Sequence, residues 1–343
     1  MIEAYDQNQK DFNDYIGLLM HDSYTIKGRV IVSLIKIAKT SSINTLELLL
    51  NYFKDDNYKE IRESLAIILG SSNRPELFEQ LAPLLASDNW SVRAYSAEAI
   101  SRMSWERRRE ANGLILKLLE DTNTFVRENA ANAIAKMGTL KNEEISQILN
   151  YLDDSSSTVR IKLIYALGKD DPTYYSAIKP LINFLDSSEE ELRSSAAISL
   201  GRIGSAANEA AEPLYKLLSD ENVQVRRQSA SAIGKIGVKN PEIISKLLSL
   251  THDDERLVRL AAIQALGKLK VGTPEVVHIL IALLYDEDVD VLGKTIQTLG
   301  EIGNTQVIVA LKRFLTKSTL YTEDGFSIGN LAKKSIELIQ TLN

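Results

Sequence analysis

Apolar residues recur along this chain in two alternating patterns, each with the spacing of an amphipathic helix. In the first pattern, leucines and isoleucines stand at positions i, i+3 and i+4, as in Leu214, Leu217 and Leu218. In the second pattern, small and aliphatic residues follow an arginine by three to seven positions, as Ala230 follows Arg226. Residues three and four apart share one face of a helix, and alanine on that face lets a neighbouring helix approach closely. The two patterns therefore predict pairs of antiparallel helices.

The second pattern repeats at a fixed spacing. Its arginine follows an aliphatic residue and recurs every 33 residues through the middle of the chain, with steps of 34 and 31 residues at the N-terminal end. These arginines are Arg62, Arg93, Arg127, Arg160, Arg193, Arg226 and Arg259. Self-similarity at such a period is the signature of a repeat array. The expected fold is all-α, an α-solenoid of about ten antiparallel helix pairs with a period of 31–37 residues.

The period predicts one solenoid over residues 1–343, with irregular pairs at both ends. Regular pairs are expected at about 43–71, 75–103, 106–138, 142–169, 174–204, 208–237, 241–270 and 274–303. Residues 1–42 and 304–343 are predicted as N-terminal and C-terminal cap pairs, because an end pair must face water on one side. The extra length of the last pair falls in residues 318–326, predicted as a loop of the cap, with a functional lid as the alternative.

Turn and stop signals frame each pair. An aspartate stands six residues before the arginine position in most repeats, where its oxygens suit a turn or a helix N-terminus. These aspartates are Asp56, Asp121, Asp154, Asp220, Asp253 and Asp286. Glycine stands eight residues after the arginine, as Gly201 and Gly234, and eleven residues after it, as Gly237. The first glycine predicts close packing between helices, and the second predicts a left-handed helix cap.

The full frame reads Pro-Leu-x-x-Leu-Leu-x-Asp, then Val-Arg, then Ala-x-x-Ala-(Ile/Leu)-Gly-x-Ile-Gly, and it resembles HEAT repeats of the short bacterial, phycobilin-lyase type over almost the whole chain. The resemblance implies a right-handed solenoid whose second helices line a concave face. It also implies that turn aspartates and arginines form a ladder between successive repeats. The ladder residues would be Asp121, Arg127, Asp154, Arg160, Arg193, Asp220, Arg226, Asp253 and Arg259. The frame departs near both ends, at Lys27, Leu292 and Gly329.

Composition narrows the classes of function. The net charge of -6 weighs against a general nucleic-acid binder, which usually carries a basic surface. The chain has no cysteine, which excludes disulfides and thiolate metal sites and fits a reducing compartment, so a cytoplasmic location is expected. The polar, acidic start predicts no signal peptide, and no apolar run is long enough to predict a membrane span.

The sequence shows no constellation of catalytic or metal-binding residues. His252 and His278 lack a second histidine at helical spacing, and no His-Glu dipeptide occurs. Residues 293–295 resemble the end of a phosphate loop, but Asp288 occupies the position of the required first glycine. The acidic residues recur with the period and are predicted as turns and solvated faces. We therefore expect no enzyme, no cofactor and no metal.

Candidate binding residues lie on the second helices, at positions that should point away from the core. A basic residue recurs nine positions after the arginine, and stacking the repeats would align these residues as a stripe. Such cations either offset the helix dipole or form an anion-binding ridge. The stripe residues counted as candidates are Arg102, Lys136, Lys169 and Arg202.

Aromatic residues mark the other part of the predicted site. Tyr95 and Tyr165 occupy outward positions of second helices, and Trp105 lies in a junction between repeats. Exposed aromatic side chains dominate many protein interfaces, but Trp105 could equally fill a gap between repeats. The predicted partner site is therefore the first half of the chain, around Tyr95, Trp105 and Tyr165, with the basic stripe as its rim.

The leading hypothesis is a non-catalytic scaffold, favoured as a monomer, that binds a protein partner along its concave face. One alternative is a phycobilin lyase or chromophore-handling factor, which rests on the resemblance alone. A further alternative is nucleic-acid binding through the basic stripe, which the net charge opposes. Stable protein partners, a coloured product with bilin, and salt-sensitive DNA binding would distinguish the three.

Overall fold

A computed structural model of the protein describes residues 14–342, except for the side chains of Trp105 and Leu342. Helices make up about 76% of the structure and pack in successive pairs, so the protein is the all-α solenoid that the repeat predicts. Within the described residues no strand forms, and the backbone of Tyr321 makes an isolated bridge with Ser327. Residues 1–13 of the predicted N-terminal cap pair lie outside the described part of the chain.

The contacts within the chain divide it into two units, one ending at Ala166 and the other beginning at Leu167. In the first unit a helix over residues 14–19 precedes α2 (Tyr24–Thr40). The pairs that follow are α3 (Ile43–Lys54) with α4 (Arg62–Ser72), α5 (Pro75–Leu81) with α6 (Trp90–Ser101), α7 (Trp105–Lys117) with α8 (Thr124–Lys136), and α9 (Asn142–Leu149) with α10 (Ser157–Leu167).

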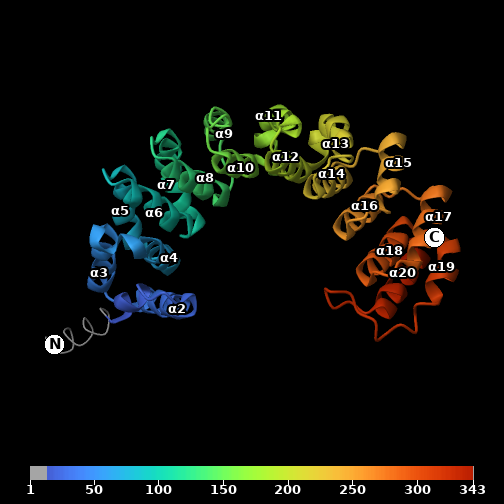
Figure 1. The fold of residues 1–343 in the computed structure, drawn as a ribbon, viewed down its shortest axis with the longest axis horizontal. Coiled ribbons are helices and arrows are strands. Elements are labelled where there is room, and N and C mark those ends of the chain that lie inside the picture. The colour runs from blue at the N-terminus through green and yellow to red at the C-terminus, as the bar shows by residue number, and fades with distance from the viewer. Residues whose placement is uncertain (1–13, 343) are drawn as a thin grey trace. The chain divides into compact units, whose positions relative to one another are not determined.

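The second unit continues the same alternation (Figure 1). Its pairs are α11 (Ile178–Asn183) with α12 (Glu190–Ile203), α13 (Ala211–Leu217) with α14 (Val223–Ile236), α15 (Pro241–Leu250) with α16 (Arg256–Lys268), α17 (Pro274–Ala282) with α18 (Val289–Ile302), and α19 (Thr305–Lys312) with α20 (Ile328–Leu342). Odd-numbered helices are thus first helices, and even-numbered helices are second helices.

The second helices pack directly on one another within each unit. In the first unit α4 lies against α2 and α6, and α6 lies against α8; in the second unit α12, α14, α16, α18 and α20 follow in contact. We call this row of even-numbered helices the second-helix layer. Each first helix covers the other side of its partner and closes the core with leucines such as Leu214 and Leu218, which are fully buried.

Glycine sets the close approach within the second-helix layer. A Cβ atom on Gly201 would lie 2.8 Å from the Cα of Ala232, and one on Gly234 would lie 2.7 Å from the Cα of Ala265. No real Cβ fits at such distances, so any larger residue would push the helices apart. At the end of α14, Gly237 adopts a φ of 86°, the left-handed cap that the sequence predicts.

Candidate functional site

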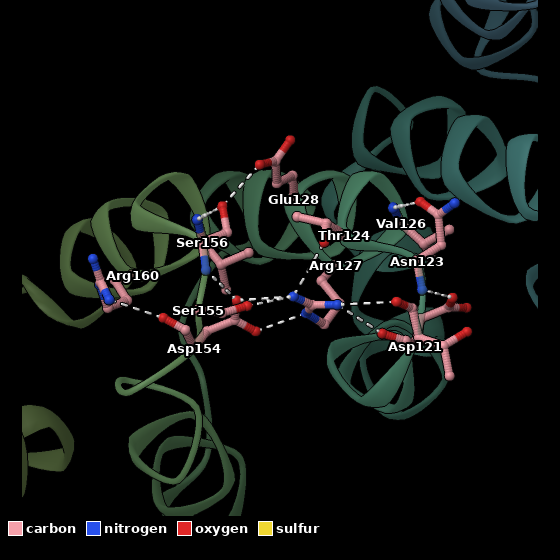
Figure 2. A network of polar contacts seen from close by, with 12 residues as sticks. Asp121, Asn123, Thr124, Val126, Arg127, Glu128, Asp154, Ser155, Ser156 and Arg160 are labelled. Atoms are coloured by element: carbon pink, nitrogen blue, oxygen red, sulfur yellow. Dashed lines mark hydrogen bonds and ion pairs between the residues drawn. The ribbon is translucent and has the colours of Figure 1, made fainter.

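The turn before each second helix carries a polar network, which Figure 2 shows in the first unit. Arg127 on α8 donates from Nη1 to the carbonyl oxygen of Asp121, at 3.0 Å, in its own turn. Its Nε and Nη2 donate to the carboxylate of Asp154 in the next turn, at 2.7 and 3.1 Å. The arginine therefore ties the turn of one repeat to the turn of the next.

Charge and burial keep this pair ionised. Burial raises the pKa of the Asp154 carboxyl, but hydrogen bonds from Arg127 and from the backbone N–H of Ser156, with the nearby positive charges, hold the pKa below its usual range. The hydrogen bond to Asp154 raises the pKa of Arg127 against the opposing effect of burial. Only 12% of the Arg127 side chain and 8% of the Asp154 side chain are exposed, so the pair is well shielded from water and salt.

The same hydrogen-bonded contact recurs for Arg93, Arg193 and Arg226, whereas Arg259 makes a longer ion pair, and its Nε has no hydrogen bond within residues 14–342. The closest N–O distances are 2.7 Å for Arg93 with Asp121, 2.8 Å for Arg193 with Asp220, 2.9 Å for Arg226 with Asp253 and 3.8 Å for Arg259 with Asp286.

Two arginines of the series make different contacts. Arg160 donates to the carbonyl oxygen of Asp154 in its own turn and to the hydroxyl of Ser157. Arg62, 1% exposed, reaches Asp56 of its own repeat and the hydroxyl of Ser91. The contacts around the arginine therefore vary from repeat to repeat.

An aromatic cluster lies on the second-helix layer of the first unit. The ring of Phe125 on α8 meets the ring of Trp90 edge to face at 5.8 Å and the ring of Tyr95 at 5.6 Å, the latter two on α6. Trp90 is 46% exposed and Phe125 is 38% exposed, whereas Tyr95 is half-buried. Burial, together with the charge of Glu63, raises the pKa of the Tyr95 hydroxyl above its usual value. We call Trp90, Tyr95 and Phe125 the aromatic patch.

The buried carboxylate of Glu98 pairs with two basic residues on the same helix layer as this patch. Glu98 on α6, only 8% exposed, accepts hydrogen bonds from Arg102 at 2.8 Å and from Lys136 on α8 at 3.1 Å. The amide of Asn132 and the hydroxyl of Ser101 also lie within hydrogen-bond distance of its oxygens. The basic stripe is therefore paired at these two positions.

The stripe has a different character in the second unit. Lys235 on α14 stands near Arg202 on α12 and Lys268 on α16, and burial followed by the charges of Lys268 and Arg202 lowers the pKa of Lys235. Within the described part of the chain, neither Lys235 nor Lys268 makes an ion pair. We call Arg202, Lys235 and Lys268 the basic row. Earlier in the stripe, the Lys169 ammonium lies 5.5 Å from the centre of the Tyr174 ring.

The loop predicted at residues 318–326 folds onto the second-helix layer of the second unit. Glu323 accepts two hydrogen bonds from Arg256, at 2.6 and 2.8 Å, and Arg256 also donates to Asp290 at 2.8 Å. The backbone N–H of Glu323 donates to Asp290 as well, at 2.8 Å. These contacts bound a cleft of about 450 Å³ between the loop and α14, α16 and α18, whose polar floor includes Gln228 and Gln264.

Residues 14–342 contain neither a metal-binding cluster nor a membrane-spanning helix. No group of three or more His, Asp or Glu side chains in this range is placed to hold a metal ion. None of the helices in the described part of the chain combines the length and apolar character needed to cross a membrane. The features that stand out are therefore the aromatic patch, the basic row and the loop-bounded cleft.

Comparison with known proteins identifies the repeat. A family model described as HEAT repeats matches overlapping segments at 78–168, 145–232, 178–267, 211–293 and 244–322, which together span well over half of the chain. The chain belongs to the HEAT-repeat family. A sequence search of curated proteins finds no match.

Solved structures show the same fold. An engineered protein has 21% identity and a TM-score of 0.54, covering 95% of this chain and 98% of its own. The YibA protein of Escherichia coli has 21% identity and a TM-score of 0.56, with 77% and 96% coverage. A chain from a structure of Kap95p with RanGDP has 12% identity and a TM-score of 0.60, covering 96% of this chain and 51% of its own. At these identities the likeness concerns the fold alone.

The HEAT-repeat structure distributes the predicted binding residues over several places. Tyr95 joins the aromatic patch, and Tyr165 is 41% exposed on α10. Trp105 begins α7, but its side chain lies outside the described residues. Arg102 and Lys136 share Glu98, whereas Lys169 and Arg202 belong to the second unit. The predicted set is therefore divided between the two units.

The sequence did not single out Trp90 or Phe125, and Glu98 was expected at an outward position without being counted among the candidate binding residues. Trp90 and Phe125 stand three and two positions before their repeat arginines, in the first turn of the helix, where the sequence analysis sought caps and not contacts. Glu98 stands five positions after Arg93 at an outward position, and its buried pairing depends on α8 as well as on α6. A signal was present, because a large aromatic residue at a helix start is unusual among these repeats.

Proposed function

We propose that this protein is a non-catalytic HEAT-repeat scaffold that binds a protein partner through the aromatic patch of its first unit. The observation that carries the proposal is the meeting of Phe125 with Trp90 and Tyr95 on a partly exposed surface. Aromatic side chains bury large areas with little loss of rotamer entropy, and they are enriched at the centres of protein interfaces. An exposed aromatic cluster of this kind suits a partner with its own apolar anchor.

The fold supports the same proposal. HEAT-repeat solenoids generally act as scaffolds and not as enzymes. A structural relative, Kap95p, binds RanGDP according to the description of its structure, although this likeness concerns the fold alone. We also propose that the protein is a monomer, that it is cytoplasmic, and that its partner is not a nucleic acid.

The residues around the aromatic patch favour a partner with an apolar anchor over an anionic partner. Arg102 and Lys136 are both paired with Glu98, so they offer no concentrated positive charge beside the aromatic rings. The partner surface should therefore be apolar at its centre and polar at its rim, as in most protein interfaces. The phycobilin-lyase and nucleic-acid hypotheses gain no support from the geometry at this patch.

Truncation of the central ring tests the proposal. Partners captured by the wild-type protein would be identified by mass spectrometry, and the dissociation constant of a purified partner would then be measured. Phe125→Ala should weaken binding by about 2 kcal/mol, roughly 30-fold, as hot-spot residues do. Tyr24→Ala, on the 90% exposed Tyr24 of α2, is the matched control and should leave binding unchanged.

A second variant keeps the test informative if Phe125→Ala does not fold. Trp90→Ala removes the more exposed ring and should weaken binding with a melting temperature close to that of the wild type. The proposal is wrong if both variants keep their fold and bind the partner as tightly as the wild type does.

A further inference from the structure

The basic row brings three cations together on successive second helices. Gly201, Gly234 and Gly267 directly precede Arg202, Lys235 and Lys268 along the chain, and the first two of these glycines pack closely against the next helix of the layer. The aliphatic part of Lys235 reaches back over α12, with its Cδ 3.6 Å from the position of a Cβ on Gly201. Close packing of the helices therefore holds like charges side by side.

The helices that carry Lys235 and Lys268 lack the carboxylate that pairs the stripe in the first unit. Glu98 stands five positions after its repeat arginine, and the same position holds Ser231 on α14 and Gln264 on α16. Glu301, the next residue along the stripe, lies against Gly267, with its Oε2 2.8 Å from the position of a Cβ, and forms no ion pair with Lys268 in the described structure. Two exposed ammonium groups thus remain without a carboxylate partner.

The spacing of the row fits one kind of extended chain. Packed helix axes lie about 8–10 Å apart, so cations at equivalent positions should recur at about that distance. A polyproline II helix has three residues per turn and rises about 3.1 Å per residue, which places every third side chain on one face at about 9 Å. A β-strand alternates its side chains between two faces, so every third residue points to the wrong side.

The surroundings favour a peptide over a nucleic acid. Phosphates of DNA follow one another at about 3.4 Å along each strand, so most of them would find no cation in this row. Single-stranded nucleic acids stack their bases on aromatic side chains, whereas Ser231 and Gln264 flank the row. Serine and glutamine side chains can instead hydrogen-bond the solvated backbone of a polyproline II segment.

We propose that the basic row of the second unit binds an acidic polyproline II segment of a protein partner, with Asp or Glu at every third residue. Lys235 and Lys268 each face one carboxylate, and Arg202 adds charge at the end of the row. This site is separate from the aromatic patch, and each can fail without the other.

Short synthetic peptides test the spacing. A fluorescent peptide, Glu-Pro-Pro-Glu-Pro-Pro-Glu, is titrated with the full chain at low salt and followed by fluorescence anisotropy. A peptide of the same composition, Pro-Pro-Glu-Glu-Glu-Pro-Pro, and a single-stranded oligonucleotide are titrated in parallel. The spaced peptide should bind at least fivefold more tightly than the clustered peptide and than the oligonucleotide. Equal binding of the two peptides, or tighter binding of the oligonucleotide, would overturn the proposal.

Charge removal tests the residues. The double variant Lys235→Gln with Lys268→Gln should bind the spaced peptide about tenfold more weakly, because two charge pairs are lost. Lys216→Gln with Lys312→Gln, which removes two exposed lysines from the first helices α13 and α19, is the matched control and should change affinity less than twofold. Thermal melts check that both proteins are folded. An unchanged affinity in the folded Lys235/Lys268 variant contradicts the proposal.

Discussion

The two units share a structural core and differ on the surface of their second helices. Arg127 with Asp154 in the first unit and Arg226 with Asp253 in the second make nearly the same contact, with closest distances of 2.7 and 2.9 Å. The outward position five residues after the repeat arginine instead carries Glu98 in the first unit and Ser231 in the second. The carboxylate at this position pairs Arg102 and Lys136 in the first unit, and Lys235 and Lys268 have no such partner in the described structure.

The aromatic residues follow the same division. Tyr95, two positions after its repeat arginine, corresponds to Gln228 in the second unit, and Phe125, two positions before its own arginine, corresponds to Gln224. The first unit therefore presents aromatic rings beside the paired Arg102 and Lys136, and the second presents amides beside Lys235 and Lys268, which form no ion pair in the described structure. In a repeat protein the positions that build the fold recur, while the remaining positions are free to specify different partners.

The largest expected effect concerns what the two units share. Arg127→Ala and Arg226→Ala should each destabilise the protein by about 2–4 kcal/mol, because each leaves a mostly buried carboxylate without its partner. Arg227→Ala is the matched control, since this neighbouring side chain makes only a 3.4 Å contact with Gln224 and should cost a few tenths of a kcal/mol. Urea unfolding gives the free energy of unfolding of all three variants. A clear difference between Arg127→Ala and Arg226→Ala would show that the ladder contact does not contribute equally in the two units.

A smaller effect is expected where the units differ. Glu98→Gln should destabilise the protein by about 1–2 kcal/mol, because Arg102 and Lys136 lose their shared charge partner. Glu106→Gln, at an exposed position of α7, is the control and should leave the urea midpoint unchanged. If both variants unfold at the wild-type midpoint, Glu98 does not organise this surface.

The converse substitution transfers the pairing to the second unit. Ser231→Glu places a carboxylate one helical turn before Lys235 and across from Lys268, as Glu98 is placed before Arg102 and across from Lys136. The affinity for the spaced acidic peptide should fall about tenfold, or ~1.4 kcal/mol. Ser245→Glu on α15 adds the same charge away from the row and should reduce affinity less than twofold. Similar losses in both variants would mean that only net charge matters.

The smallest effect is a dependence of stability on pH. Burial raises the pKa of Asp253, but hydrogen bonds from Arg226 and the N–H of Glu255 lower it overall, so its folded-state pKa lies below the unfolded value. Its contribution is therefore fully present above about pH 4 and is lost as the pH falls through the folded-state pKa. Arg226→Ala should make the urea midpoint less sensitive to pH in this acidic range. An unaltered pH profile would show that the pair is not the cause.

The sequence predicted what depends on position within the repeat. Helix pairs, the tight packing at Gly201 and the left-handed cap at Gly237 all follow from residue type at a fixed slot. The residue that caps each second helix was harder to predict from the sequence. The sequence left the aspartates open between a turn and a helix N-terminus, and the structure shows that Asp121 accepts the N–H of Asn123 within the turn, whereas Asn123 caps α8. Two polar residues in one turn compete for the same donors, and only the backbone geometry decides between them.

The candidate surface was harder to predict because it depends on pairs of helices. Phe125 belongs to the surface because its ring contacts Trp90 and Tyr95 on the preceding second helix. Lys136 belongs to it because its ammonium group pairs with Glu98 on that same helix. Residues of this kind are 30 to 38 positions apart in the chain, and their contact depends on the direction of each side chain. Counting positions from the repeat arginine places Tyr95, Glu98 and Lys136 on the outward face, but it does not say which residues meet.

The most direct test of the difference between the units is a lysine-resolved titration. Lysines carrying isotope-labelled dimethyl groups keep their charge and give separate NMR signals, which single Lys→Arg variants assign. Addition of the spaced acidic peptide to the full chain should shift the signals of Lys235 and Lys268 and leave that of Lys136 in place, because Lys136 is already paired with Glu98. Equal shifts at all three lysines, or a shift at Lys136 alone, would contradict the assignment of the acidic-segment site to the second unit.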